Sequence, residues 1–254
     1  MKFSGVLSAL TLAGAVAAKP GTKYPTTIVA GIEVVDTQIV RDARELIEVF
    51  NDLQPYLYKH LHRTWLFAAA IFNANETLKN SIDLEFHAVG SLLHDLGWDM
   101  RPNSPYVTQL DRFEVDSGVA AVNWVKEYVK ENKCFAKKWN NVARLEKLYD
   151  GIALQTEQSI RRFGIPWPPR PRIPEDDYQS IIAAYPNDYL FRGSNITFTY
   201  LAATKPTGTY NTFLQDFGVH YVPGYDPSGK TFFDLIQEGA EGETKLHPNA
   251  TLTS

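Results

Sequence analysis

The 254-residue sequence contains a single cysteine, Cys134, which excludes an intrachain disulfide and a zinc site built on several cysteines. It has no excess of positive charge, because 25 Lys and Arg stand against 29 Asp and Glu and give a formal net charge of −4. No basic stripe follows the chain either, so nucleic acid is not expected as a partner. With 44% hydrophobic and 13% aromatic residues, the composition excludes intrinsic disorder and is enough for a sizeable core.

The sequence also lacks a hydrophobic run long enough to span a membrane. The small and apolar run Val6–Ala18 is too short, because a helix needs about 20 residues to cross a hydrocarbon core of about 30 Å. Lys2 precedes this run, small residues end it, and Lys19-Pro20 follow, which is the order of a secretory signal peptide. We therefore expect residues 1–18 to be removed and residues 19–254 to form a secreted, extracellular protein without a membrane anchor.

Three acceptor sequons for N-glycosylation follow in the chain. Each reads Asn-x-Thr without proline in the middle, and they begin at Asn75, Asn195 and Asn249. Together with the signal peptide, they predict a glycoprotein.

Hydrophobic periodicity predicts an all-α fold, a helical bundle with its core at residues 36–163. A first helix is expected from Asp36 to about Asn51, a second from Pro55, and a third that Ser81 or Asp83 caps. Two more are expected at about 113–132 and 140–162. No stretch before residue 165 alternates with a period of two, so no strand is expected there.

The composition changes at residue 164. The segment 164–174 contains five prolines and is expected to be extended. Residues 175–254 predict one helix near 174–185, a loop around Gly193 and two short helical pieces near 210–217 and 231–237. We expect this part to be an irregular C-terminal wrap over the bundle, within a single domain.

Histidines are the candidate metal ligands. Four of the six, namely His60, His62, His87 and His94, fall within 35 residues, and Asp95 follows the last of them. Imidazole and carboxylate are ordinary ligands for zinc, iron or manganese. On a helix His60 and His62 point about 200° apart, so His62 is expected to point away from a site that His60 faces. His87 and His94 lie about 10.5 Å apart along a helix axis, too far for one ion.

The residues around these histidines resemble the HD (His-Asp) superfamily of metal-dependent hydrolases. YKHLHRTWLFA resembles the N-H-S-x-R-x-Y helix of that family and places His60 at its first metal histidine and Arg63 at its arginine. GSLLHDLGW resembles its H-D-[IL]-G signature, with His94 and Asp95 as the paired ligands. RFEVDSGVAAVNWVKE, LYDGIALQT and TYNTFLQDFGVHYVPGY resemble the fungal cyanamide hydratase-like branch, so the resemblance covers about residues 36–237 with one gap.

This resemblance implies an HD-domain-like helical bundle that binds one divalent metal ion, zinc, iron or manganese, through His60, His94 and Asp95. Asp95 is also the expected catalytic residue. The implied activity is hydrolysis or hydration of a small polar molecule at a C–N or phosphoester centre by metal-activated water. Further candidates for the pocket are Arg63, His87, Asp116 and Gln155.

The chain departs from the family pattern at two points. Gln155 stands where the branch has a histidine. The family helix that carries the last ligand aspartate has no counterpart, because the proline-rich segment 164–174 occupies its place. The candidates for the missing ligand are Asp116, Asp150, Asp176 and Asp177. These departures leave a second hypothesis open, a non-catalytic secreted protein on the same scaffold with a degenerate metal site.

Overall fold

The structure is a computed structural model that describes residues 24–156 and 173–246. Its described residues are predominantly helical, with one small two-stranded sheet, which confirms the predicted all-α class. The predicted signal peptide, the proline-rich segment up to residue 172 and Asn249 lie outside the described residues. Among the helices of the described ranges, none combines the length and the apolar character that crossing a membrane requires.

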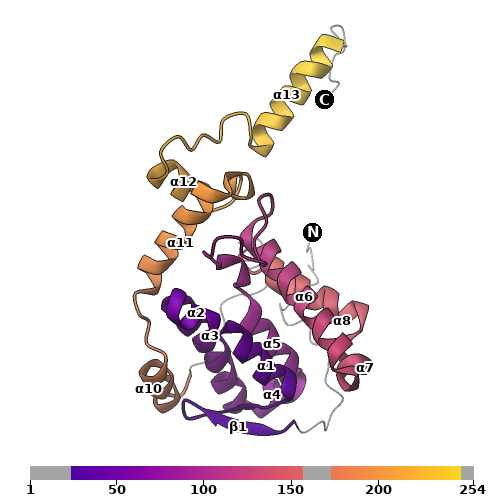
Figure 1. The fold of residues 1–254 in the computed structure, drawn as a ribbon, viewed down its shortest axis with the longest axis vertical. Coiled ribbons are helices and arrows are strands. Elements are labelled where there is room, and N and C mark those ends of the chain that lie inside the picture. Colours follow the sequence, from indigo (N-terminus) through magenta and orange to yellow (C-terminus); the bar gives the residue numbers. More distant parts are fainter. Residues whose placement is uncertain (1–23, 157–172, 247–254) are drawn as a thin grey trace, which may run out of the picture. The chain divides into compact units, whose positions relative to one another are not determined.

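The chain divides into two compact units, residues 1–107 with 113–193 and residues 108–112 with 194–254. The first unit holds a hairpin and a helical bundle (Figure 1). Its helices are α1 (Gln38–Ile47), α2 (Val49–Leu53), α3 (Pro55–Asn73), α4 (Glu76–Ser81), α5 (Leu84–Leu93), α6 (Phe113–Glu131), α7 (Ala136–Trp139), α8 (Val142–Ala153) and α10 (Glu175–Ala184), with the short 3-10 turns η1 (Leu96–Trp98) and η2 (Lys133–Phe135). Helix α5 packs against α1 and α3, and α6 packs against α8 and η1 (Figure 1).

The hairpin β1 (Thr26–Val29) and β2 (Ile32–Val35) contradicts the prediction that no strand precedes residue 165. Its strands are antiparallel, and Ala30 and Gly31 form the turn with φ angles of 48° and 79°. Each strand has only four residues, and β2 buries Ile32, Val34 and Val35, so its burial does not follow strict alternation. A period of two cannot be recognised in so short a run.

Two helices begin at the residues that the local sequence signals predict. Pro55 is the first residue of α3, where its missing N–H removes no hydrogen bond. Asp83 caps α5, because its side chain accepts a hydrogen bond from the backbone N–H of Phe86 at 3.0 Å. The first helix begins one residue later than expected, with Thr37 as its N-cap instead of Asp36.

A buried cluster of charged side chains joins α5 to α7 and α8. Arg144 donates to the Asp83 carboxylate at 2.7 Å, Lys138 pairs with Glu85, and Tyr24 donates its hydroxyl to Asp83 at 3.0 Å. Burial by itself would raise the pKa of Asp83, but the hydrogen bond and the charge of Arg144 hold it below its ordinary value. Asp83 therefore stays ionised, and the ion pairs tie the start of α5 to α7 and α8.

Helix α11 (Leu190–Thr204) begins in the first unit and continues into the second. The expected loop around Gly193 is wrong, because Gly193 lies inside this helix. A Cβ at that position would stand 2.4–2.6 Å from the ring of Tyr56, so glycine is needed for the close contact and does not mark a turn.

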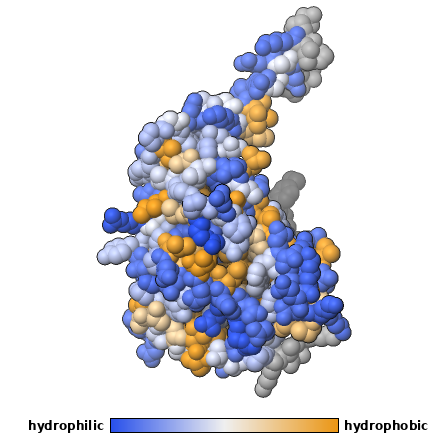
Figure 2. Space-filling view, in the orientation of Figure 1, coloured by the Kyte–Doolittle hydropathy of each residue, from blue (hydrophilic) through white to orange (hydrophobic). Residues whose placement is uncertain are grey.

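The second unit continues with η3 (Pro206–Thr209), α12 (Gln215–Tyr221) and α13 (Phe232–Leu246). Phe198 of α11 packs edge-on against Phe213 and Phe217, with ring centroids 5.3 and 5.1 Å apart. Helix α13 is longer than expected, and its first turns carry exposed hydrophobic residues, whereas the rest of it is hydrophilic (Figure 2). Much of the C-terminal part is thus regular helix.

Candidate metal centre

The structure brings His60, His94 and Asp95 together. His60 lies in the middle of α3, His94 follows the last residue of α5, and Asp95 precedes η1. The two Nε2 atoms are 3.2 Å apart, and Asp95 Oδ2 lies 3.2 Å from that of His60 and 3.1 Å from that of His94. Helices α3 and α5 pack directly on each other, so residues 34 positions apart in the chain meet at one point.

A glycine positions the turn that carries His94 and Asp95. The backbone N–H of Gly97 donates to Ser117 Oγ at 2.8 Å, and that hydroxyl donates to the carbonyl of Phe113 at 2.7 Å. A Cβ on Gly97 would lie 2.2 Å from the Phe113 carbonyl oxygen. The turn can therefore dock on the start of α6 only because residue 97 has no side chain.

The hydrogen bond at the far side of His94 determines which of its nitrogens is free. Its Nδ1 lies 2.8 Å from the carbonyl oxygen of Ser91, which can only accept, so Nδ1 carries the hydrogen. In the neutral ring, Nε2 then has a lone pair and faces Asp95 and His60. This is the orientation that a backbone carbonyl commonly gives to a metal-binding histidine.

Electrostatics make Asp95 the anionic member of the group. Burial alone would raise the pKa of this carboxyl, but the imidazoles of His94 and His60 hold it well below its ordinary value. For His94, burial lowers the pKa, but the Asp95 carboxylate more than offsets this and raises it. Asp95 therefore stays ionised although it is buried at 3% exposure, and it supplies the negative charge of the site.

The donor set suits a divalent metal ion. Two imidazole nitrogens and one carboxylate oxygen form the set that catalytic zinc and non-haem iron sites use while they leave positions open. The 3.1–3.2 Å between the three atoms is close to the ~3.4 Å expected between ligands of a tetrahedral ion with bonds of ~2.1 Å. These residues could therefore hold one metal ion.

No fourth His, Cys, Asp or Glu among residues 24–156 and 173–246 joins this group within 4.8 Å. Asp116, Asp150, Asp176 and Asp177 are thus outside it. Asp116 is buried at 2% exposure on the first turn of α6. Gln155, which follows α8, does reach the site and contacts both His94 and Asp95.

Arg63 contributes to the fold around the site. Its guanidinium donates to the carbonyl oxygens of Tyr185 at 3.2 Å and Pro186 at 2.5 Å and to Asn187 Oδ1 at 3.2 Å. It therefore holds the segment after α10 against α3.

His62 points away from His60 as expected. Its Nδ1 atom lies 3.0 Å from the carbonyl oxygen of Tyr58, and its ring stacks on the ring of Tyr185 with centroids 4.5 Å apart.

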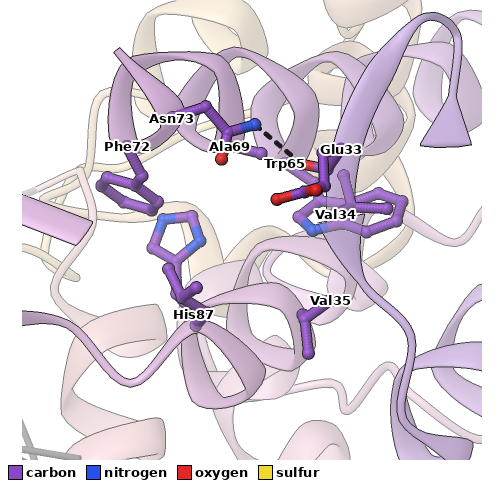
Figure 3. Close-up of a pocket in the computed structure, with 9 residues that line it drawn as sticks. Glu33, Val34, Val35, Trp65, Ala69, Phe72, Asn73 and His87 are labelled. Atoms are coloured by element: carbon purple, nitrogen blue, oxygen red, sulfur yellow. Dashed lines mark hydrogen bonds between the residues drawn. The ribbon is translucent and has the colours of Figure 1, made fainter. Parts of the chain in front are cut away.

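His87 lies in a different hollow, between β2, α3 and the start of α5. Figure 3 shows its ring turned toward Phe72, and the ring centroids are 4.9 Å apart at an angle of 87°. Across the hollow, the Asn73 side chain donates to the backbone carbonyl of Glu33 at 2.8 Å (Figure 3). The volume is about 20 Å³, enough for one water molecule.

At pH values below about 6.5, the free energy of unfolding is expected to decrease, because His62 and His87 are protonated more readily in the unfolded chain. Burial lowers the pKa of each imidazole from 6.5 to about 4. The unfolded chain therefore binds these protons first, and stability that is present above pH 6.5 is lost as the pH falls toward 4. Urea unfolding between pH 6.5 and about pH 4 should show that the free energy of unfolding decreases less for His87→Phe than for the wild type. The exposed His220 supplies the control, and an equal slope in His87→Phe and His220→Ala would contradict this assignment.

Two partners of the site were not singled out in the sequence, Ser117 and Trp98. The Trp98 indole stacks on His60 with centroids 5.9 Å apart and planes 10° apart. Trp98 directly follows the turn His94-Asp95-Leu96-Gly97, so the sequence could have indicated that it lies near the site. Ser117 lies on another helix, and no feature of the sequence links it to the site.

Comparison with known proteins adds no relative, because no family model, curated protein or solved structure matches the chain.

Proposed function

We propose that this protein is a secreted, metal-dependent hydrolase or hydratase of the HD type that acts on a small polar substrate at a C–N or phosphoester centre. The observation that carries the proposal is the convergence of His60, His94 and Asp95 within 3.2 Å of one another. The resemblance of the surrounding motifs to the HD superfamily supports the same reading.

A divalent ion at this place would supply Lewis-acid chemistry and lower the pKa of a water molecule that it binds. His94 offers a neutral nitrogen because Ser91 holds the hydrogen on its other nitrogen. Asp95 offers negative charge, and its burial keeps bulk water from screening that charge. His60 has the most open side chain of the three, at 26% exposure, so substrate is expected to approach beside it and along the Trp98 indole.

Metal analysis of the purified, secreted protein tests this proposal. We expect one equivalent of zinc, iron or manganese, together with turnover in a panel of small amide, nitrile and phosphoester substrates that a chelator abolishes. Protein that binds none of these metals at micromolar concentration, and turns over none of the substrates, would refute it.

The alternative is a non-catalytic secreted protein with a degenerate site. The feature that favours it is that His60, His94 and Asp95 lie at hydrogen-bond distance from one another, so a proton on the Nε2 atom of each imidazole satisfies Asp95 Oδ2 without an ion. This alternative would be supported if the protein binds metal but turns over no substrate in the panel, or if it neither binds metal nor turns over any substrate.

We also propose that the secreted chain carries glycans at Asn75 and Asn195, which are both exposed. Asn75 caps α4 through Oδ1, which accepts from the Leu78 N–H at 3.0 Å, so a glycan on Nδ2 leaves the cap in place. In a glycosylating host, Thr77→Ala should remove one glycan and increase gel mobility without loss of stability. Asn75→Ala should remove the same glycan and also cost about 1 kcal/mol through the lost cap. Mobility that glycosidase does not change would contradict the prediction.

A further inference from the structure

The side chain of Gln155 faces the metal centre as a hydrogen-bond donor. Its Nε2 atom lies 2.9 Å from the carbonyl oxygen of His94 and 3.0 Å from Asp95 Oδ1. The carbonyl and the ionised carboxylate carry no hydrogen, so the atom that faces them must be the amide nitrogen. An amide nitrogen has two hydrogens, and both are used here, one on each of two neighbouring residues of the site.

The two oxygens of Asp95 consequently have different partners. Oδ1 accepts from Gln155, whereas Oδ2 faces the Nε2 atoms of His60 and His94. Asp95 occupies the N-cap position of η1, but its side chain makes no capping hydrogen bond that would orient it. The orientation of the carboxylate therefore depends on contacts from other elements, and among residues 24–156 and 173–246 Gln155 is the one that reaches the oxygen turned away from the histidines.

We propose that Gln155 is a positioning residue, which holds one oxygen of Asp95 so that only the other is presented, with the two imidazole nitrogens, to a metal ion. A neutral amide suits this role because it fixes the carboxylate without adding a positive charge that would repel a cation. The inference rests on the proposed function for the presence of the ion, but the orientation of Asp95 is a property of the metal-free protein.

The turn that carries Gln155 is fixed independently of the site. The backbone N–H of Gln155 donates to the Ile152 carbonyl at 3.2 Å, and the hydroxyl of the next residue, Thr156, donates to the carboxylate of Glu114 on α6. Glu114 is fully buried. Thr156→Val therefore offers a matched control, because it removes a hydrogen bond from the same turn and leaves the Gln155 amide in place.

The experiment compares the wild type, Gln155→Leu, Gln155→Glu and Thr156→Val as metal-depleted full-length protein. Calorimetric titration with zinc, and with cobalt for its absorption spectrum, measures affinity and coordination. We expect Gln155→Leu to weaken binding ~10–100-fold, the usual effect of removing an outer hydrogen bond to a ligand. Gln155→Glu keeps the shape but replaces the donor by a carboxylate, which repels the Asp95 carboxylate and should turn it away from its wild-type orientation. Its cobalt spectrum should differ from that of the wild type, because Asp95 is free to offer both oxygens. Thr156→Val should bind like the wild type.

The outcomes separate this inference from the proposed function. Wild-type affinity and an unchanged cobalt spectrum in both Gln155 variants would overturn the positioning role and leave the metal site intact. If the wild type binds no metal, the proposed function fails, and crystal structures of the metal-free variants decide the inference. Asp95 in an unchanged orientation in Gln155→Leu would then overturn it, whereas a rotated carboxylate in that variant, with the wild-type orientation kept in Thr156→Val, would support it.

Discussion

Asp95→Ala and His94→Ala are each expected to abolish metal retention. Either change leaves two donors, and a divalent ion held by His60 and one remaining group exchanges freely with solvent. The loss should exceed the ~10–100-fold that removing an outer partner costs. Asp95→Ala also removes the negative charge of the site, so we expect it to have the larger effect. Metal content after gel filtration, measured beside calorimetric titration, gives the result directly.

The control for removing a histidine is His220→Ala, because His220 is exposed on α12 in the second unit. It should keep the metal content and the thermal stability of the wild type. A wild type without metal, together with a His94→Ala variant that folds equally well, would refute the metal centre and favour the degenerate site.

Gly97→Ala is expected to destabilise the protein and to disturb the site at once. The new Cβ would lie 2.2 Å from the carbonyl oxygen of Phe113 and 2.9 Å from Ser117 Oγ, so the turn must move away from α6. Overpacking against backbone costs typically 1–3 kcal/mol and occasionally more, and we expect about 3 kcal/mol here. For a chain of this size that loss lowers the Tm by about 6–12 °C. His94 and Asp95 precede the moved residue, so metal affinity should fall as well.

Gly151→Ala provides the matched comparison. Gly151 lies within α8, and a Cβ there would meet nothing within 4 Å. Replacing a helical glycine by alanine in open space stabilises by about 0.5–1 kcal/mol, so the two substitutions should change the Tm in opposite directions. A Gly97→Ala variant as stable as the wild type would show that the turn does not depend on the close contact with α6.

The helices with strong local signals could be predicted because those signals lie within a few residues of each end. Pro55 and Asp83 begin α3 and α5 for reasons that the neighbouring backbone supplies. The hairpin at residues 26–35 could not be recognised, since its strands are short and β2 is buried by α3 and α10. The prediction of a loop at Gly193 was wrong, because glycine is needed there for close contact with the ring of Tyr56, which lies 137 positions earlier in the chain.

The sequence by itself determined the all-α class and the choice of His60, His94 and Asp95 as the candidate ligands. Helical geometry allowed only one of His60 and His62 at a shared site, and the resemblance to the HD superfamily selected His60 together with the adjacent His94 and Asp95. Only the tertiary structure decided what surrounds them. Arg63 turns to carbonyls more than 120 residues away, and the Gln155 amide reaches Asp95 from a turn 60 residues away. A polar side chain takes whichever partner packing places within about 3 Å, and periodicity along the chain carries no information on contacts between distant segments.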